Sequence, residues 1–283
     1  MDVMILYEIV TKQELATNIY LIEIAADDVA KKSKPGQFVI IRLDDKGERV
    51  PLTIAGVDLS KGTVAVAFHA VGRTTKKLAN LNTGESIMDL SGPLGNPAEV
   101  SKFGNVLLVG GGVWCAPLHY VATALRENDN KLYVVCAGRT KNDMVYEDKL
   151  KEISNEFYVA TDDGSKGNEG LGFLEDVLRS QKFDHVAVMG PVSMMKKVVE
   201  MTRPYGLKTM VTLASLMVDG TGMCGACRVT VGDETKFACM DGPEFNGLEV
   251  NFDELVKRQR VYLPEERMAS MIYDKLGGGI KHG

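Results

Sequence analysis

Four residues near the C-terminal end have the types and the spacing of metal ligands. They are Asp219, Cys224, Cys227 and Cys239, in the stretch DGTGMCGACRVTVGDETKFAC. The spacing D-x4-C-x2-C with a more distant cysteine is the plant-type [2Fe-2S] pattern with aspartate in the first position. Small residues between the cysteines let backbone N–H groups approach the cluster sulfurs. The pattern therefore predicts a [2Fe-2S] centre, and with it electron transfer.

Two other sites could use the same side chains. A zinc ribbon needs a second C-x2-C pair, but only Cys239 follows the first pair, so zinc would need three cysteines and an aspartate. Buried structural thiols are the second alternative, although Cys224 and Cys227 lie among glycines rather than in an apolar run. The remaining cysteines, Cys115 and Cys136, fall in apolar surroundings, where we expect buried, reduced thiols.

Composition limits the possible partners. The 283 residues are 45% hydrophobic and 25% charged, which is typical of a globular protein with room for more than one domain. The net charge of -5 gives no reason to expect nucleic acid or an anionic membrane as partner. The first ten residues, MDVMILYEIV, lack the basic start of a signal peptide, and acidic residues interrupt their apolar run. We therefore expect a cytoplasmic protein without a membrane span.

Residues 1–101 have the pattern of an antiparallel β-barrel. Short apolar stretches rich in β-branched residues alternate with turn signals such as Pro35-Gly36. Several such strands at close spacing indicate a barrel, which one helix from Arg73 to Leu81 interrupts. The predicted strands are Ile19 to Ile24, Phe38 to Leu43, Thr53 to Val57 and Thr63 to Phe68.

From residue 102 to 214, strand-like runs alternate with helical ones. This alternation predicts βαβ units and a parallel sheet. It stops after Leu213, and residues 215–283 then form a third, smaller unit with the predicted iron-sulfur loop. The predicted strands of the parallel sheet are Val106 to Val109, Lys131 to Cys136, Phe157 to Thr161, Val186 to Met189 and Lys208 to Leu213.

The run VGGGVWCAP, from Val109 to Pro117, joins a predicted strand to a predicted helix. Glycines let the backbone approach a pyrophosphate, and the helix N-terminus supplies N–H donors. Such a run can also be only a tight turn. Three further strand ends carry polar or glycine-rich loops, at residues 136–140, 161–170 and 190–195. Because ligands of such sheets bind beyond the carboxyl ends of the strands, the four loops predict a dinucleotide crevice.

Two motifs stand out in the barrel. In RVPLT, Arg49 could pair with a phosphate and Thr53 could hydrogen-bond a flavin ring nitrogen, although a solvated surface charge explains Arg49 equally well. In VGRTTKKL, Gly72, Thr74 and Thr75 stand at a helix start, where they could face a phosphate. Threonine there is also an ordinary N-cap, and sequence alone favours that role.

These units, in this order, resemble the ferredoxin-NADP reductase superfamily, in which a flavin-binding antiparallel barrel precedes a nicotinamide-binding domain. The cysteine loop narrows the resemblance to the electron-transfer subunits of dihydroorotate dehydrogenase B, which usually have cysteine where Asp219 stands. Asp219, CMDGPEFNG from Cys239 to Gly247 and LPEERM from Leu263 to Met268 are similar to small subunits of ferredoxin- and NADP-linked, electron-bifurcating oxidoreductases. The resemblance covers nearly the whole chain.

The resemblance implies three cofactors, FAD, NAD(H) and the [2Fe-2S] cluster, and residues that contact them. It implies no catalytic acid or base, because hydride transfer needs none. Pro51, Leu52 and Thr53 would lie at the isoalloxazine ring, Arg49, Gly72, Thr74 and Thr75 near the FAD pyrophosphate, Gly111, Gly112 and Pro117 against the nicotinamide nucleotide, and Asp162, Asp163 and Gly190 along its pocket.

Three features depart from the family pattern or leave it open. The superfamily's R-x-Y-S motif has arginine three residues before the hydroxyl, where this chain has Val50, and its tyrosine is replaced by Leu52. Trp114 stands where the related loop normally has a small residue, and it suits either a shield over the flavin or nicotinamide or a core anchor. Arg139 and Lys141 could accept a 2′-phosphate, whereas the resemblance favours NAD(H).

A flavin connects two kinds of electron transfer, because nicotinamide passes electrons in pairs and a [2Fe-2S] centre passes them singly. The three units therefore predict a converter between the two. Its electrons need a destination, so we expect a larger partner subunit, which the resemblance implies carries another flavin, further clusters and the NADP site and connects the chain to ferredoxin. The alternatives are the electron-transfer subunit of dihydroorotate dehydrogenase B and a zinc-stabilised binding module without redox activity.

Overall fold

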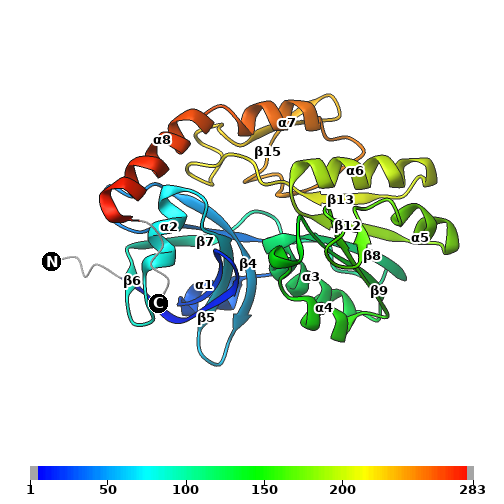
Figure 1. Cartoon of the computed structure of the whole chain (residues 1–283), viewed down its shortest axis with the longest axis horizontal. Helices are drawn as coiled ribbons and strands as arrows, with labels where there is room; N and C mark the ends of the chain where they lie inside the picture. Colours follow the sequence, from blue (N-terminus) through cyan, green and yellow to red (C-terminus); the bar gives the residue numbers. More distant parts are fainter. Residues whose placement is uncertain (1–5, 279–283) are drawn as a thin grey trace.

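The computed structural model describes residues 6–278, which form three units (Figure 1). The strands of the first unit are β1 (Tyr7–Ala16), β2 (Ile19–Ala25), β3 (Phe38–Arg42), β4 (Val50–Asp58), β5 (Thr63–His69), β6 (Ser86–Ile87) and β7 (Asp89–Leu94). They form one antiparallel sheet in the order β6-β1-β2-β5-β4-β3-β7. Only Met88 separates β6 from β7, so one stretch of chain pairs with β1 and then with β3. This pairing nearly closes the sheet into a barrel.

Apolar side chains fill the inside of this barrel. Ile22, Ile41 and Ile54, from three different strands, are 0% exposed. Such β-branched residues suit the pleated surface of a sheet. The helices α1 (Asp27–Lys32) and α2 (Arg73–Asn80) add Val29 and Leu78 to the same core. The barrel therefore has its own hydrophobic core, as a separately packed unit requires.

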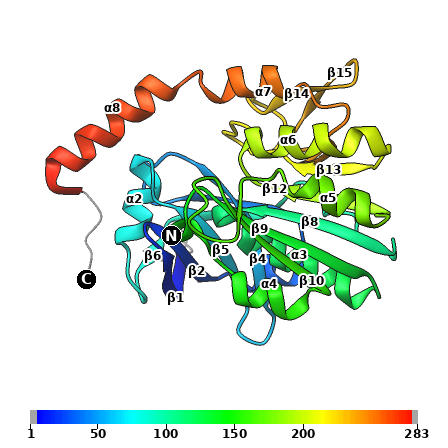
Figure 2. The same cartoon turned by 45° about the vertical axis from the view of Figure 1, so that its right-hand side comes forward.

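The second unit is a parallel sheet with helices on both faces (Figure 2). Its strands are β8 (Asn105–Gly111), β9 (Lys131–Gly138), β10 (Glu156–Thr161), β11 (Asn168–Glu169), β12 (His185–Met189) and β13 (Thr209–Thr212). They lie in the order β11-β10-β9-β8-β12-β13. Strands β9 to β11 therefore lie on one side of β8, and β12 and β13 lie on its other side. The carboxyl ends of β8 and β12 flank this switch point, where ligands of such folds bind.

Alternating side chains divide the helices between the two faces of the sheet. Val134 packs with Leu118 of α3 on one face, and its neighbour Val135 packs with Val177 of α5 and Val198 of α6 on the other. The helical segments of this unit are η1 (Gly112–Trp114), α3 (Cys115–Glu127), η2 (Lys141–Asp143), α4 (Glu147–Ile153), α5 (Leu174–Ser180), α6 (Val192–Thr202) and η3 (Arg203–Tyr205).

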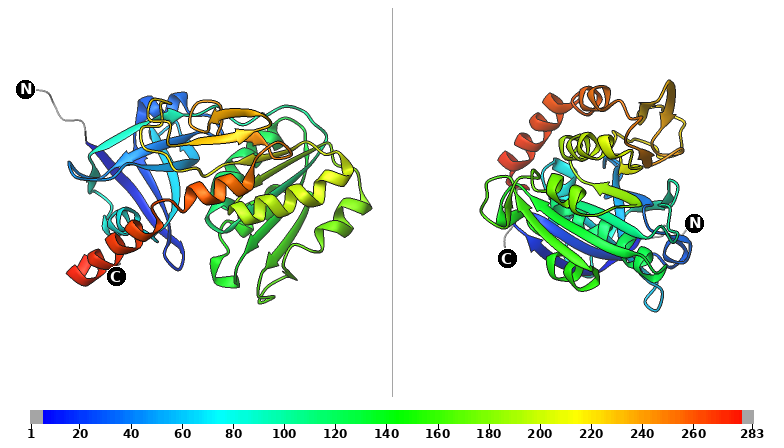
Figure 3. Two further views of the ribbon diagram at one scale, coloured as in Figure 1. Left: turned by 90° about the horizontal axis from the view of Figure 1, so that it is seen from above. Right: turned by 90° about the vertical axis from the view of Figure 1, so that its right-hand side faces the viewer.

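The third unit contacts both of the others. Its elements are β14 (Arg228–Val231), β15 (Glu234–Phe237), β16 (Glu244–Asn246), α7 (Phe252–Gln259), α8 (Leu263–Tyr273) and η4 (Asp274–Gly278). Strand β16 pairs antiparallel with β13 and so extends the parallel sheet. Phe245 of β16 shares one core with Phe38 and Ile40 of the barrel. From α7 the chain continues into α8, which reaches back to α2 of the barrel (Figure 3).

A small apolar contact also joins the barrel to the parallel sheet. Ala116 of α3 is 0% exposed and packs with Leu21, Ala55 and Ala67 from three strands of the barrel. Alanine at these positions lets the helix approach the strands closely. The contact places the loop after β8 next to the end of β5.

The predicted fold class is confirmed. Each predicted strand overlaps an observed one, and the helix predicted from Arg73 to Leu81 is α2. Sequence reasoning missed β1, whose YEIVTKQELA sequence is largely polar, as well as β7 and the short strands β6, β11 and β14 to β16. Among residues 6–278, no helix has both the length and the apolar character needed to cross a membrane.

Candidate functional site

The four predicted cluster ligands lie together in the loop around β14 and β15. Cys227 and Cys239 are each 1% exposed, and their Sγ atoms are 3.2 Å apart, whereas Cys224 is exposed. Asp219 lies beside Cys224, because one carboxylate oxygen accepts the Cys224 N–H at 2.7 Å and the other accepts the Thr221 N–H at 2.9 Å. The ligands therefore form two pairs, Asp219 with Cys224 and Cys227 with Cys239.

This donor set fits a [2Fe-2S] cluster. Burial, together with the contact to Cys227, raises the pKa of the Cys239 thiol to about 12, so its thiolate forms only where a positive charge compensates. Two irons would supply that charge, and the two pairs would provide the two protein ligands that each iron needs. Within residues 6–278, no group of three or more His, Cys, Asp or Glu side chains is already arranged to hold a metal ion.

Glycine brings the cluster loop against the barrel. Gly220 has φ +74°, and a Cβ there would lie 2.5 Å from Cδ1 of Ile40 in β3. Any side chain would therefore clash with the barrel and strain the backbone. The loop packs on the barrel wall because this position is glycine.

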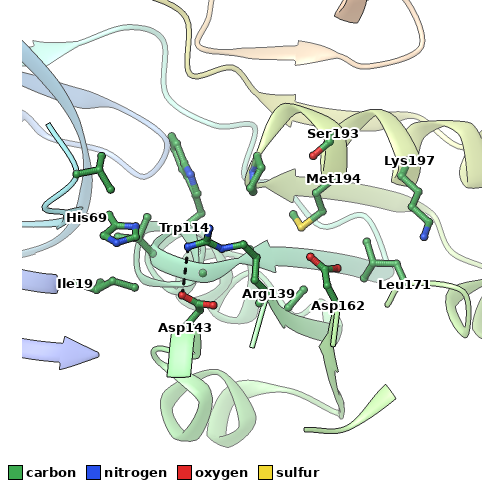
Figure 4. Close-up of a pocket in the computed structure, with 17 residues that line it drawn as sticks. Ile19, His69, Trp114, Arg139, Asp143, Asp162, Leu171, Ser193, Met194 and Lys197 are labelled. Carbon is green, nitrogen blue, oxygen red and sulfur yellow. Dashed lines mark ion pairs between the residues drawn. The ribbon is translucent and has the colours of Figure 1, made fainter. Parts of the chain in front are cut away.

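A cleft of about 690 Å³ lies between the barrel and the carboxyl ends of the parallel strands (Figure 4). Of the residues predicted for the nicotinamide nucleotide, Gly111, Gly112 and Asp162 line the cleft. Gly190 lies directly before Pro191, which also lines it. Pro117 is buried in α3, and Asp163 is exposed outside the lining.

At two glycines of the switch point, a side chain would require Met194 to move. A Cβ on Gly111 would lie 2.8 Å from Sδ of Met194, and a Cβ on Gly190 would lie 2.2 Å from Cε of the same methionine. Met194 therefore lies against the backbone at the ends of both β8 and β12, and both glycines are buried. Such glycines permit the close backbone approach that a pyrophosphate needs.

Charged side chains in the cleft are divided between paired and single groups. Arg139 Nη2 lies 3.7 Å from Oδ1 of Asp143, and Oδ2 of Asp143 accepts the Thr140 N–H at 3.0 Å. Asp162 has no ion-pair or hydrogen-bond partner for its carboxylate among residues 6–278, and Lys197 lines the cleft from α6. The cleft is therefore lined by an arginine paired with Asp143, by the single carboxylate of Asp162 and by Lys197.

Two aromatic rings lie at the side of the cleft nearest the barrel. Trp114 projects from η1 between His69 of β5 and Met194 of α6 (Figure 4). Burial lowers the pKa of His69, and the positive charge of nearby Arg139 lowers it further. The imidazole is therefore neutral at pH 7. Neutral, partly apolar groups of this kind keep water out without introducing charge.

The barrel residues predicted for FAD fall into two groups. Pro51 and Thr53 share one face of β4, whereas Leu52 is 8% exposed, packs in the barrel core and so is not free to stack on a ring. Arg49 is exposed just before β4. The start of α2 lies beside this segment, because Thr74 contacts Glu48, the residue before Arg49.

The start of α2 has its own hydrogen bonds. The N-cap is Gly72 rather than a threonine, and its N–H donates to Oγ1 of Thr75, the third residue of the helix, at 3.1 Å. Thr74 is 7% exposed and donates to Oε2 of Glu48 at 2.6 Å. Glycine at the N-cap leaves the helix end open to a phosphate from outside.

Sequence reasoning missed several residues that line the cleft. His69 stands two residues before the VGRTT motif, which is a usable signal for its place in the cleft. Asp143, Met194 and Lys197 come from separate elements and follow no motif. Only the folded sheet brings them together.

Comparison with known proteins identifies the family. Residues 214–251 match a family model described as the iron-sulfur cluster binding domain of dihydroorotate dehydrogenase B, and this range includes all four predicted ligands. A Thermotoga maritima homolog of the dihydroorotate dehydrogenase B electron-transfer subunit is 45% identical over 275 residues, which is 96% of this chain and 97% of the relative. The Clostridium perfringens electron-transfer subunit is 31% identical, over 84% and 94% of the two chains. This chain belongs to the dihydroorotate dehydrogenase B electron-transfer subunit family.

Solved structures extend the comparison of this electron-transfer subunit. A chain from the structure of an NADH-dependent reduced ferredoxin-NADP oxidoreductase is 44% identical, with a TM-score of 0.89 and coverage of 98% of this chain and 99% of that one. Phthalate dioxygenase reductase has 16% identity, a TM-score of 0.57 and coverage of 81% and 87%, which shows a shared fold alone. The resemblance to the ferredoxin-NADP reductase superfamily and to this subunit family is therefore confirmed.

Proposed function

We propose that this chain is the small subunit of an NADH-dependent reduced ferredoxin:NADP+ oxidoreductase. It would exchange hydride between NAD(H) and FAD, and single electrons between FAD, the [2Fe-2S] cluster and a larger subunit. The observation that carries the proposal is the likeness to the solved enzyme of that name along the full chain, at 44% identity and a TM-score of 0.89. The aspartate at position 219 supports the same assignment.

The three cofactor sites follow from the residues already described. FAD, when bound, supplies the exchange between paired and single electrons that neither nicotinamide nor a [2Fe-2S] cluster can supply alone. Pro51 and Thr53 on the outer face of β4, with the start of α2, would hold it. The close glycine backbones at Gly111 and Gly190 would receive the nicotinamide nucleotide pyrophosphate.

The cleft residues would orient the nucleotide and exclude water. Trp114 and the neutral His69 form an apolar wall where nicotinamide and flavin must meet. Lys197 provides a positive charge on the opposite wall. No residue of the cleft has to move a proton, because hydride transfer from NADH requires only alignment of the two rings.

The charges in the cleft favour NAD(H) over NADP(H). Arg139, which sequence reasoning left as a possible partner of a 2′-phosphate, is paired with Asp143. Lys141 does not line the cleft. The single carboxylate of Asp162 would repel a 2′-phosphate and could accept a hydrogen bond from a ribose hydroxyl.

A larger partner subunit is part of the proposal. Curated relatives are named as electron-transfer subunits, which by their names belong to larger enzymes. The third unit of this chain also exposes large apolar side chains on α8, with Met268 at 64%, Met271 at 59% and Ile272 at 52%. Exposed apolar side chains at this density support a contact with another protein.

Isolation of the complex under anaerobic conditions tests the proposal. We expect a larger flavin and iron-sulfur subunit to co-purify, and the complex to reduce NADP+ only when NADH and reduced ferredoxin are both present. The second candidate, which the family model over residues 214–251 favours, is the electron-transfer subunit of dihydroorotate dehydrogenase B. A co-purifying subunit that oxidises dihydroorotate would establish that function instead.

A further inference from the structure

Helix α8 and the turn η4 contact α2 of the barrel through polar side chains. Lys76 of α2 donates to Oδ2 of Asp274 at 2.6 Å and to Oγ of Ser270 at 2.9 Å. One turn further on, Asn80 donates to the Tyr273 hydroxyl at 3.3 Å. The Lys76 side chain is only 17% exposed, so this ion pair is partly shielded from water. These contacts join residues nearly 200 positions apart in the sequence.

Helix α8 meets α2 through its polar face and turns its apolar face outward. Ser270 and Asp274 are four residues apart and so lie on one side of the helix, while Met268 and Ile272 form the corresponding pair on the other side and are exposed. No residue of α8 is buried. Hydrophobic packing therefore does not hold α8 on α2, and its position there depends on the polar contacts.

Helix α2 is short, and few of its residues are buried. It has eight residues, about 12 Å of helix, and only Thr74, Leu78 and Ala79 are buried. Its C-terminal end is tied to the barrel by Lys12, whose Nζ donates to the carbonyl oxygens of Ala79 and, at 2.9 Å, of Leu81. Lys12 and Asn80 therefore hold the C-terminal end of α2, and Lys76 ties the middle of the helix to α8 and η4. Lys77 Nζ also lies 3.2 Å from Oδ2 of Asp44 in the barrel.

We propose that α8 and η4 act as a clamp that positions α2 for FAD, with Lys76, Ser270 and Asp274 as positioning residues. The inference rests on the proposed FAD site at the start of α2. A helix N-terminus binds a pyrophosphate only when its N–H groups point at the phosphate oxygens, so a tilt of α2 weakens that contact directly. Because the clamp belongs to the unit that carries the cluster, FAD affinity in the barrel depends on a segment at the opposite end of the chain.

A charge swap in the full-length protein tests the clamp. Lys76→Asp and Asp274→Lys each place like charges in contact, whereas the double variant restores an opposite pair. We expect each single variant to raise the dissociation constant of FAD for the flavin-free protein about fivefold, as the loss of a partly shielded ion pair predicts. The double variant should return it to within about twofold of wild type. If each side chain acted only within its own element, the double variant would not regain FAD affinity.

Two controls make the outcome specific. Lys275→Asp changes the charge of the neighbouring residue, which is exposed and has no ion-pair partner among residues 6–278, and it should leave FAD affinity unchanged. Hydrogen exchange should show faster exchange of α2 amides in the single variants only. If all variants bind FAD as wild type does, the clamp is wrong while the proposed function stands. If the wild-type protein binds no FAD, the proposed function fails and the clamp fails with it.

Discussion

Asp219 distinguishes this chain from the four-cysteine pattern, and its carboxylate has a second task. It accepts N–H groups from Thr221 and Cys224, and the first of these does most to hold its pKa below the ordinary value. A carboxylate oxygen has lone pairs enough to accept such a bond and still bind iron. Asp219 therefore stabilises the loop through these hydrogen bonds and remains available as a ligand.

Substitutions at Asp219 separate these two tasks. Asp219→Cys should keep the cluster but change its reduction potential and the pH dependence of that potential, because thiolate is a softer and more basic ligand than carboxylate. Asp219→Asn keeps one oxygen, which can accept one of the two loop hydrogen bonds, and so serves as the control for folding. The measurement is an EPR-monitored redox titration. Wild-type EPR and redox behaviour in both Asp219→Cys and Asp219→Ala would mean that Asp219 is not a ligand.

Asp162 and Asp163 form a matched pair for nucleotide choice. Asp162→Asn should raise kcat/KM for NADPH relative to NADH about tenfold, because a carboxylate and a phosphate roughly 10 Å apart repel by about 1–2 kcal/mol at the effective dielectric of a protein surface. Asp163→Asn makes the same change in charge outside the cleft and should leave the ratio near that of wild type. Equal ratios in the two variants would contradict the role given to Asp162.

The docking of the cluster loop on the barrel can be measured through two glycines. Gly220 and Gly232 have φ of +74° and +61°, but only a Cβ at Gly220 would meet the barrel. We expect Gly220→Ala to lower the free energy of unfolding by at least about 1 kcal/mol more than Gly232→Ala does, since overpacking adds to the backbone cost. Urea titrations give both values. Equal losses would mean that the loop does not depend on its contact with β3.

The first residue of β12 is a histidine whose pKa is lower in the folded chain than in the unfolded chain. His185 is 2% exposed and stacks on Phe103 with 4.0 Å between ring centroids, and burial lowers its pKa to about 4. The unfolded chain binds a proton below about pH 6.5, and the folded chain does not until about pH 4. This one group therefore removes up to about 3 kcal/mol of stability as pH falls through that window.

A phenylalanine at position 185 tests that sign. His185→Phe keeps the stacked ring and removes the proton-binding group, so its free energy of unfolding should fall less steeply than that of wild type between pH 6.5 and 4. Denaturant titrations at several pH values compare the two proteins. Parallel curves would contradict the assignment of a depressed pKa to His185.

Across the whole chain, local patterns were readable from the sequence and long-range contacts were not. The cysteine loop within residues 214–251 and the loop around Gly111 follow short motifs, so both loops could be predicted before the fold was known. The clamp between Lys76 and Asp274, the three-residue strand β16 and the ring of His69 in the cleft all depend on contacts between distant segments. No periodicity or motif marks such residues, because each looks like an ordinary surface or strand position.

An anaerobic titration of the purified protein with NADH, followed by its visible spectrum, tests the central claim most directly. The account predicts a coloured protein in which iron-sulfur absorption underlies a flavin band, and bleaching of that band by about one NADH per chain. A preparation loaded with iron, sulfide and FAD that stays colourless, or a flavin band that NADH leaves unchanged, would contradict the account.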